Sequence, residues 1–212
     1  MPKQIIYDEE VRNRFMCGIN KVANAVSVTY GSAGPAVMIE HIASGLPPVF
    51  TRDGVTVAKA INCEDRTEDL GARMLRDAAS AVSRKVGDGT TSTIVLAQAI
   101  SKECMIHVTT GYHPIQLKRG MDLALAFVEA KLKEQAISGI NSDWIESISA
   151  IATKNEPGVG TLLVEAFDKL GTESPLTFQL GNSREDQLSI VDGLSYEQGY
   201  LSPYFVTDSD RD

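Results

Sequence analysis

The segment Gly87-Asp88-Gly89-Thr90-Thr91-Ser92 has the composition of a phosphate-binding loop. Its glycines let the main chain pass close to an anion. The N–H groups at the start of a following helix would point at that anion, and the helix dipole would favour its negative charge. The hydroxyls of Thr90, Thr91 and Ser92 would add donors. Asp88 would repel a phosphate unless it holds a Mg²⁺ that the phosphate also binds, so the segment indicates phosphate together with magnesium.

The same segment also has a purely structural interpretation. Asp88 or Thr90 would cap a helix, and Gly-Asp-Gly would form a turn. Taken alone, the six-residue motif favours this structural interpretation, because short motifs often match by chance. The sequence contains neither GxxxxGK[ST] nor a GxGxxG followed by an acidic residue in a βαβ unit. Their absence argues against a P-loop enzyme and against a dinucleotide-binding fold.

The composition is that of a globular protein. The 212 residues suffice for one good-sized domain or for one domain and a fragment, and 43% are hydrophobic and 23% charged. The net charge of −8 argues against nucleic acid as a partner, because phosphate backbones repel an acidic chain. The first ten residues lack the apolar core of a signal peptide, and no apolar run could span a bilayer. We therefore expect a cytoplasmic protein with no membrane partner.

The elements that must position the loop are predicted from apolar periodicity. A helix with one apolar stripe is expected first, and Gly31 and Gly34-Pro35 end it. Its stripe consists of Val11, Phe15, Ile19, Val22 and Val26. Two short strands follow at 37–39 and 49–51, and Asp53-Gly54 is expected to form a turn. The loop then lies between two of three long helices, at 69–86, 90–108 and 114–133.

Each long helix has a predicted buried face. The first would bury Leu70, Met74, Ala78, Ala81 and Val82, and the third Leu117, Met121, Ala124, Leu125, Val128 and Leu132. The second is apolar nearly all round over 93–97, so we expect it at the centre of the core. Cys17, Cys63 and Cys104 lack zinc-ligand spacing and are expected to be reduced, mostly buried thiols. Beyond about 134 we expect helices at 144–154 and 159–170 and strand-like runs at 176–178 and 188–191.

Six stretches in order along the chain resemble the group I chaperonins, the GroEL-like family, and match its N-terminal portion. The resemblance implies a mainly α fold with small β elements: the N-terminal part of the equatorial ATPase domain at 1–134, the ascending part of the intermediate domain at 135–191, and the beginning of the apical domain at 192–212. The matching stretches are Val26-Ser27-Val28-Thr29-Tyr30-Gly31, Thr51-Arg52-Asp53-Gly54-Val55-Thr56-Val57-Ala58, Gly87-Asp88-Gly89-Thr90-Thr91-Ser92-Thr93, Val95-Leu96-Ala97-Gln98-Ala99-Ile100, Pro114-Ile115-Gln116-Leu117-Lys118-Arg119-Gly120 and Gly199-Tyr200-Leu201-Ser202-Pro203-Tyr204-Phe205.

The resemblance also implies a site for ATP and Mg²⁺. Asp88 would coordinate the metal, and Asp53 would lie beside the γ-phosphate as a catalytic residue. Arg52 stands where the family usually has lysine, and the two cations differ in geometry. The remaining nucleotide-binding residues would be Thr29, Tyr30 and Gly31 against the nucleotide, and Gly89, Thr90, Thr91 and Ser92 around the phosphates.

The sequence departs from the family directly after Gly31. The family pattern there is Pro-Lys-Gly-Arg-Asn, whereas this chain has Ser32-Ala33-Gly34-Pro35-Ala36 and lacks both basic residues. Less positive charge near a triphosphate should weaken its attraction. The family's general-base aspartate lies in a part that this sequence does not contain. We therefore expect the 212-residue chain alone to be impaired as an ATPase and to hydrolyse ATP negligibly.

The resemblance further implies protein partners. Tyr200, Ser202, Tyr204 and Phe205 match a segment that binds unfolded client proteins and the co-chaperonin; alternatively, these residues fill the core of the apical domain. The implied function is that of an ATP-dependent chaperone subunit, which assists protein folding and refolding and forms a homo-oligomeric ring in the complete protein. Two alternatives are a truncated or degenerate paralogue without catalysis and a chaperonin dedicated to one client enzyme.

Overall fold

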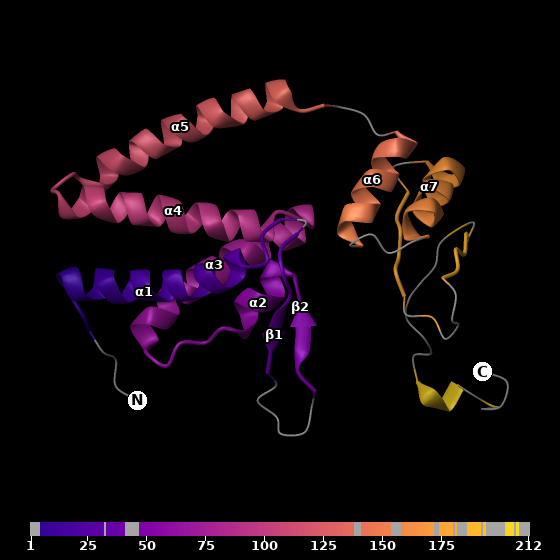
Figure 1. The fold of residues 1–212 in the computed structure, drawn as a ribbon, viewed down its shortest axis with the longest axis horizontal. Coiled ribbons are helices and arrows are strands. Elements are labelled where there is room, and N and C mark those ends of the chain that lie inside the picture. Colours follow the sequence, from indigo (N-terminus) through magenta and orange to yellow (C-terminus); the bar gives the residue numbers. More distant parts are fainter. Residues whose placement is uncertain are drawn as a thin grey trace. The chain divides into compact units, whose positions relative to one another are not determined.

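The computed structural model describes residues 5–31, 33–40, 47–137, 141–153, 158–171, 174–179, 181, 186–191, 193, 202–205 and 207. The chain forms two compact units, Met1–Ala136 and Ile137–Asp212. In the described residues the fold is mainly helical with one small β element, as the sequence predicted (Figure 1).

The first unit contains five helices and a two-stranded antiparallel ribbon among its described residues. The helices are α1 (Asp8–Ser27), α2 (Gly54–Ala60), α3 (Arg66–Val86), α4 (Thr90–Thr109) and α5 (Pro114–Gln135). The ribbon pairs β1 (Val37–Ile39) with β2 (Val49–Thr51), with Met38 opposite Phe50. The predicted strands and four of these helices are confirmed, with the helix ends within three residues of the predicted ones.

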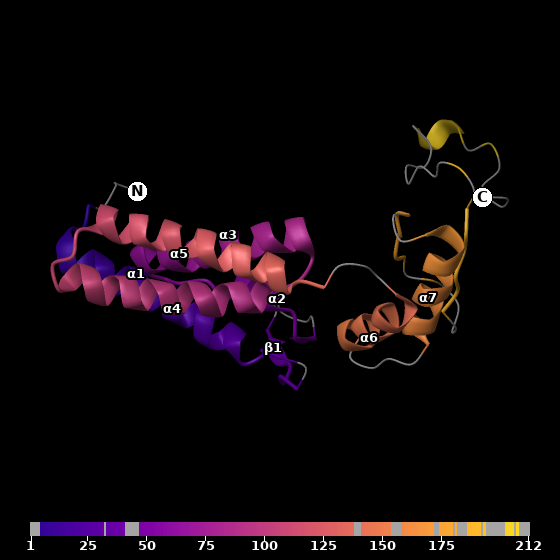
Figure 2. The same cartoon turned by 90° about the horizontal axis from the view of Figure 1, so that it is seen from above.

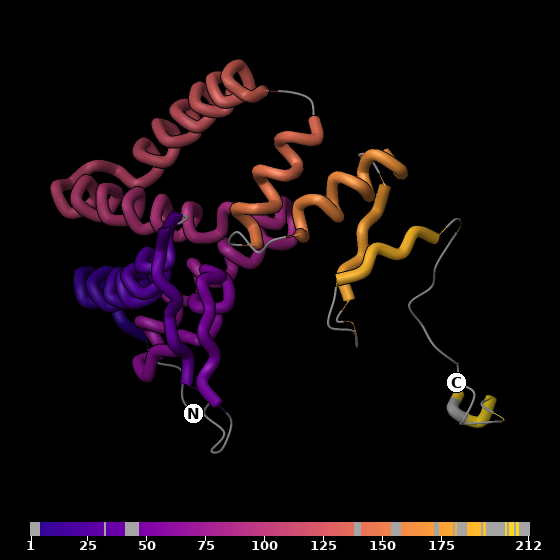
Figure 3. Tube along the Cα trace, turned by 45° about the vertical axis from the view of Figure 1, so that its right-hand side comes forward, coloured from indigo at the N-terminus to yellow at the C-terminus, as the bar shows by residue number. Residues whose placement is uncertain are grey.

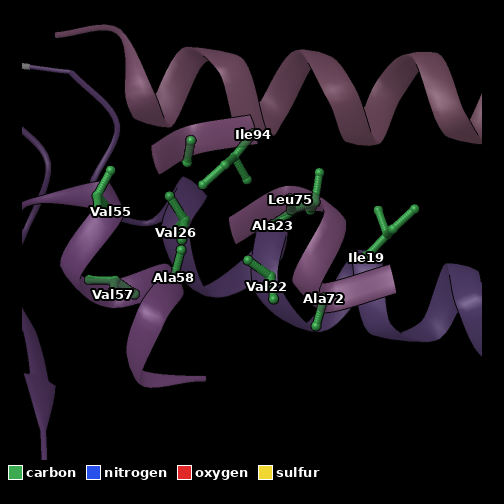
Figure 4. Close-up of a cluster of buried hydrophobic side chains, with 11 residues drawn as sticks. Ile19, Val22, Ala23, Val26, Val55, Val57, Ala58, Ala72, Leu75 and Ile94 are labelled. Atoms are coloured by element: carbon green, nitrogen blue, oxygen red, sulfur yellow. The ribbon is translucent and has the colours of Figure 1, made fainter. Parts of the chain in front are cut away.

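The core of this unit lies where α1 packs on α2, α3 and α4. Ile19, Val22 and Val26 of the predicted stripe are fully buried, and Phe15 packs against them from the edge of the cluster. Figure 4 shows these side chains meeting Leu75 of α3 and Ile94 of α4. Burying several aliphatic side chains at about 1.5–3 kcal/mol each stabilises this end of the unit.

Two glycines let α1 and α3 cross in close contact. A Cβ at Gly18 would lie 1.8 Å from the main-chain oxygen of Glu68, and a Cβ at Gly71 would lie 2.1 Å from that of Phe15. No larger residue fits at either position without moving one helix. The reciprocal pair therefore sets the face of α3 that is buried.

That face differs from the predicted one. The buried residues of α3 are Thr67, Gly71, Ala72, Leu75 and Ala79. Leu70 and Met74 are 56% and 44% exposed, and Ala81 is also exposed. The prediction turned Leu70 and Met74 inward, whereas the helix buries Leu75 together with small residues, because these permit the close crossing.

The predicted burial of the later helices is also wrong. Helix α4 buries only Thr90 and Ile94, and Leu96 is 61% exposed, so α4 covers one side of the core instead of lying at its centre. Helix α5 turns back beyond α4 and diverges from it (Figure 3). None of its residues is buried, and of its predicted stripe only Leu117 is even half-buried.

Helix α2 replaces the turn predicted at Asp53-Gly54. Asp53 is its N-cap, and Val55, Val57 and Ala58 are buried. Two of its seven residues are valines, which have weak helix propensity. Packing against α1 and α3 outweighs that propensity here. Helix α2 begins beside the predicted phosphate loop and positions Asp53.

In the second unit, α6 (Ser142–Ala152) packs on α7 (Val159–Leu170), as Figure 2 shows. Ile145, Ser149 and Ala166 are buried between them. Both helices were predicted. The strand-like runs 176–178 and 188–191 are not strands in the structure, because neither forms a ladder with a neighbouring segment. A short 3-10 helix covers Pro203–Phe205.

The three cysteines are free thiols, as predicted, but each is half-buried instead of buried. The domain boundaries predicted at 134 and 191 stay predictions. Among the helices that the structure describes, none is long and apolar enough to cross a membrane.

Candidate nucleotide and metal site

Two glycines shape the loop between α3 and α4. Gly87 caps the C-terminus of α3 with φ +86°, and Gly89 is the N-cap of α4 with φ +79°. Residues with a Cβ rarely adopt such angles. A Cβ at either position would meet no atom within 4 Å, so the loop borders open space that an anion could enter.

The N-terminus of α4 is open to an acceptor. No side chain caps it, and the oxygen of Gly89 accepts from the N–H and the hydroxyl of Thr93, both at 2.9 Å. Over the residues that the structure describes, the N–H groups of Thr90, Thr91 and Ser92 have no hydrogen-bond partner. Unpaired first-turn N–H groups and the helix dipole suit a phosphate.

Asp88 has the character of a magnesium ligand. Its carboxylate is exposed, and its Oδ1 accepts from the N–H of Gly89 at 2.7 Å. The described part of the chain brings no cluster of three or more His, Cys, Asp or Glu side chains together. A site with one carboxylate suits Mg²⁺, which is usually held by one or two carboxylates together with water and substrate phosphates. The residues present therefore fit Mg²⁺ bound with a nucleotide.

Asp53 is held between β2 and α2. Its N–H donates to the hydroxyl of Thr51 at 3.0 Å. Its Oδ1 accepts from the N–H of Val55 at 3.3 Å, and its Oδ2 from the N–H of Thr56 at 2.9 Å. The Thr56 hydroxyl also donates to Oδ2. The carboxylate is thus oriented although it is exposed.

Gly54 joins the Asp53 segment to the phosphate loop. A Cβ at this buried glycine would lie 2.4 Å from Oγ1 of Thr91, 3.3 Å from Oγ1 of Thr90 and 3.2 Å from a methyl of Val26. The start of α2, the start of α4 and the end of α1 therefore converge on one point. Figure 4 shows Val26, Val55 and Ile94 from the same three helices packed side by side.

The segment after α1 forms the third side of this site. Thr29 is buried, and its hydroxyl donates to the oxygen of Val26 at 2.8 Å, so it faces its own helix end. Tyr30 is 57% exposed, and Gly31 has φ +82°. A Cβ at Gly34 would lie 2.5 Å from the carbonyl of Thr29. The altered segment is therefore a tight turn folded back on Thr29, although Ser32 lies outside the described residues.

Basic side chains near the loop come from neighbouring segments. Arg52 is exposed and directly precedes Asp53. Arg84 and Lys85 lie in the last turn of α3, three and two positions before Gly87. These cations would add positive potential for a polyphosphate, which the turn at 33–36 does not supply.

The groups with shifted pKa values lie at the other end of α3. The pKa of Asp65 is held below its usual value by the main-chain N–H of Glu68. The Lys21 ammonium lowers the pKa of the Glu68 carboxyl, and the Arg76 guanidinium lowers the pKa of Asp69. The Glu68 carboxylate raises the pKa of the Cys17 thiol. At 1.5 Å per residue, Glu68 is about 30 Å from the loop along the helix. These charges serve the α1–α3 crossing and not the site.

The residues predicted to bind client proteins belong to the second unit. Tyr204 is 96% and Phe205 65% exposed, and Ser202 is half-buried. The N–H of Phe205 donates to the oxygen of Ser202 at 3.0 Å. Tyr200 lies outside the described residues. Both described aromatic rings are exposed to solvent in this chain.

Sequence reasoning missed Gly34, Gly54 and Thr56, which shape the site without belonging to the predicted set. A signal for the start of α2 existed, because an aspartate such as Asp53 is a typical N-cap residue. The glycines carried no local signal. Their role follows from close approaches between segments far apart in the sequence.

Comparison with known proteins identifies the family of this chain. The model of the TCP-1/cpn60 chaperonin family matches residues 22–209. Chaperonin GroEL 3 of Methylococcus capsulatus is 50% identical over all 212 residues, which cover 38% of that protein. The chain thus spans well under half the length of this curated relative and corresponds to its N-terminal part.

Solved chaperonin structures share the fold. The chaperonin gp146 of bacteriophage EL 2 (Pseudomonas aeruginosa), crystallised in the presence of ATP-BeFx, matches with a TM-score of 0.66 at 24% identity over 80% of this chain and 30% of its own. A group III chaperonin in the open state matches with a TM-score of 0.65 at 25% identity, over 78% of this chain and 33% of its own. The chain belongs to the TCP-1/cpn60 chaperonin family.

Proposed function

We propose that this chain supplies the Mg-ATP-binding part of an ATP-driven chaperone subunit that assists protein folding and assembles into a homo-oligomeric ring with its co-chaperonin. One observation carries the nucleotide site. The close approach of Gly54 to Thr90 and Thr91 places Asp53 beside the uncapped N-terminus of α4. Membership of the chaperonin family makes ATP the nucleotide to test first.

The roles divide among the residues by their chemistry. The N–H groups and hydroxyls of Thr90, Thr91 and Ser92 bind phosphate oxygens, and Asp88 binds Mg²⁺. Bound Mg²⁺ would neutralise the charge that develops on the transferred phosphoryl group. Asp53 orients the reacting end of the triphosphate. Arg52 and the Thr29–Gly31 segment border the nucleotide.

The second unit supplies the surface for clients in this proposal. Tyr204 and Phe205 present exposed aromatic rings, and aromatic residues contribute strongly to binding surfaces. Unfolded chains expose apolar segments that such rings would bind. The cytoplasm is the compartment in which we place this activity.

A non-catalytic paralogue is the second candidate, and one observation favours it. The turn after Gly31 carries neither basic residue of the family pattern, so attraction for a triphosphate is reduced there. A protein of this kind would bind the same clients without turnover. A subunit dedicated to one client enzyme would also tolerate this change.

Calorimetric titration of the chain with ATP, with and without Mg²⁺, tests the site. We expect binding that depends on Mg²⁺, and we expect Asp88→Ala to weaken Mg-ATP binding by roughly tenfold or more, since the cation then loses its protein ligand. Asp77→Ala is the matched control, because Asp77 is an exposed carboxylate of α3 that forms no hydrogen bond or ion pair with the described residues. The affinity of Asp77→Ala for Mg-ATP should equal that of the parent chain.

Phosphate release measured alongside separates binding from turnover. The chain alone is expected to release phosphate negligibly, because it lacks the family's general base. Binding that ignores Mg²⁺, or that survives Asp88→Ala unchanged, would refute the site. Steady turnover that disappears in Asp88→Ala would instead keep the site and overturn the expected impairment.

A further inference from the structure

Helix α2 fixes both oxygens of the Asp53 carboxylate. Oδ1 accepts one bond, from the N–H of Val55 at 3.3 Å. Oδ2 accepts two bonds, from the N–H of Thr56 at 2.9 Å and from the Thr56 hydroxyl. A carboxylate offers about four acceptor positions, two on each oxygen. The position that remains is therefore on Oδ1.

Asp65, which caps α3, shows that the hydroxyl is not needed for capping. Its Oδ1 alone accepts from the N–H groups of Thr67 and Glu68, at 2.8 and 3.1 Å. Its Oδ2 pairs with the Arg14 guanidinium at 2.7 Å. The residue three positions after Asp65 is glutamate, which donates no such bond to its cap. The two caps therefore share their main-chain bonds and differ in what occupies Oδ2.

The two capping aspartates, Asp53 and Asp65, also differ in whether a basic side chain pairs with them. Arg14 compensates Asp65, whereas no lysine or arginine in the described part of the chain forms an ion pair with Asp53. A threonine hydroxyl holds a carboxylate without neutralising it. Among the described residues, the Asp53 carboxylate is thus oriented by hydrogen bonds alone, and the next residue, Gly54, closely approaches Thr90 and Thr91. That arrangement suits an oxygen that must accept from a metal-bound or attacking water.

We propose that Thr56 is a positioning residue of the nucleotide site: its hydroxyl occupies Oδ2 of Asp53 and so presents Oδ1 toward the phosphates bound at α4. The inference rests on the proposed function and deepens it. It predicts that the Thr56 hydroxyl matters for the γ-phosphate end of ATP and not for ADP. It also predicts that Asp53 loses its single orientation when the hydroxyl is removed.

The test compares Thr56→Val, which keeps the shape and removes the hydroxyl, with Thr56→Ser, which keeps the hydroxyl. Calorimetry with Mg-ATP and Mg-ADP gives the preference for ATP. We expect that preference to fall about tenfold in Thr56→Val, as for the loss of one hydrogen bond to a charged group, and to stay within about twofold in Thr56→Ser. Asp53→Asn should lower it as well, and Thr56→Val should add little in that background.

A second measurement needs no nucleotide. Three-bond NMR couplings report the χ1 angle of Asp53, which we expect to be a single rotamer in the parent chain and in Thr56→Ser and averaged in Thr56→Val. An unchanged rotamer or an unchanged ATP preference in Thr56→Val overturns the inference. Equal loss of ATP and ADP binding in Thr56→Val also overturns it, because that would indicate a merely structural role for α2.

The outcomes separate this inference from the function on which it rests. If Asp88→Ala removes Mg-dependent binding while Thr56→Val behaves as the parent chain, the proposed function stands and the inference falls. If the parent chain binds neither nucleotide, the proposed function fails and the inference fails with it.

Discussion

Helices α1 and α5 are similar in sequence texture and opposite in environment. They have 20 and 22 residues, and each carries apolar side chains at helical spacing. Helix α1 buries Gly18, Ile19, Val22, Ala23 and Val26, whereas α5 buries no residue. Apolar periodicity therefore identifies a helix and its apolar side, but it does not say what covers that side.

The difference comes from what each helix can approach. Gly18 of α1 faces the main chain of Glu68, and Gly71 of α3 faces that of Phe15, at a crossing that no larger residue permits. Gly120 of α5 meets no atom within 4 Å. Helix α5 instead exposes Leu123, Leu125 and Phe127 by more than half. An apolar surface of this kind marks a contact that the described part of the first unit does not make.

Glycine substitutions should have the largest and most different effects on helices α1 and α5. Gly18→Ala places a Cβ 1.8 Å from the Glu68 oxygen, so the helices must separate, and we expect a loss of about 3 kcal/mol or more in the free energy of unfolding. Gly120→Ala is the matched control and should stabilise the chain by about 0.5–1 kcal/mol, because alanine favours the helix and meets open space. Urea unfolding followed by circular dichroism measures both.

Equal effects of the two glycine variants on the free energy of unfolding would contradict this prediction. Such a result would mean that the α1–α3 crossing does not limit stability. A destabilising Gly120→Ala would show that α5 is packed against something in solution.

Leucine truncation gives a smaller contrast. Leu75 of α3 is fully buried, and Leu75→Ala should cost about 2–5 kcal/mol through lost burial and a cavity. Leu125 of α5 is 57% exposed, so Leu125→Ala should change stability by no more than about 0.5 kcal/mol. Thermal unfolding of the two variants measures the difference, and a cost for Leu125→Ala matching that of Leu75→Ala would refute it.

Acid should weaken the α1–α3 crossing by a smaller amount. The pKa values of Asp65, Glu68 and Asp69 are lowered in the folded chain, chiefly by hydrogen bonds from the Glu68 N–H, Lys21 and Arg76 respectively. A lowered pKa contributes stability above the unfolded value of about 4, and this contribution is lost as the pH falls through the folded value. The urea midpoint should therefore decline as the pH falls from about 5 to 3.

Asp65→Asn should flatten that decline, because the amide cannot change its charge. Asp77→Asn, on the exposed side of the same helix, should leave it unchanged. A decline that is equally steep in Asp65→Asn would show that other carboxyl groups determine the acid sensitivity.

Several features followed from the sequence alone. The glycines at Gly87 and Gly89 predicted a loop with free helix N–H groups, and both adopt the left-handed conformation that this requires. The two strands and the long helices followed from local patterns. The family followed from six ordered stretches, because ordered matches at fixed spacing carry far more information than one short motif.

The tertiary structure alone decided burial and convergence. The buried face of α3, the exposure of α5 and the helix at 54–60 depend on which segments meet, and local propensity does not encode that. Gly54 illustrates the reason: its neighbours in space are Val26, Thr90 and Thr91, which lie 28 to 37 positions away in the sequence. Periodicity and propensity act over one or two turns, whereas steric exclusion acts between any segments that the fold brings together.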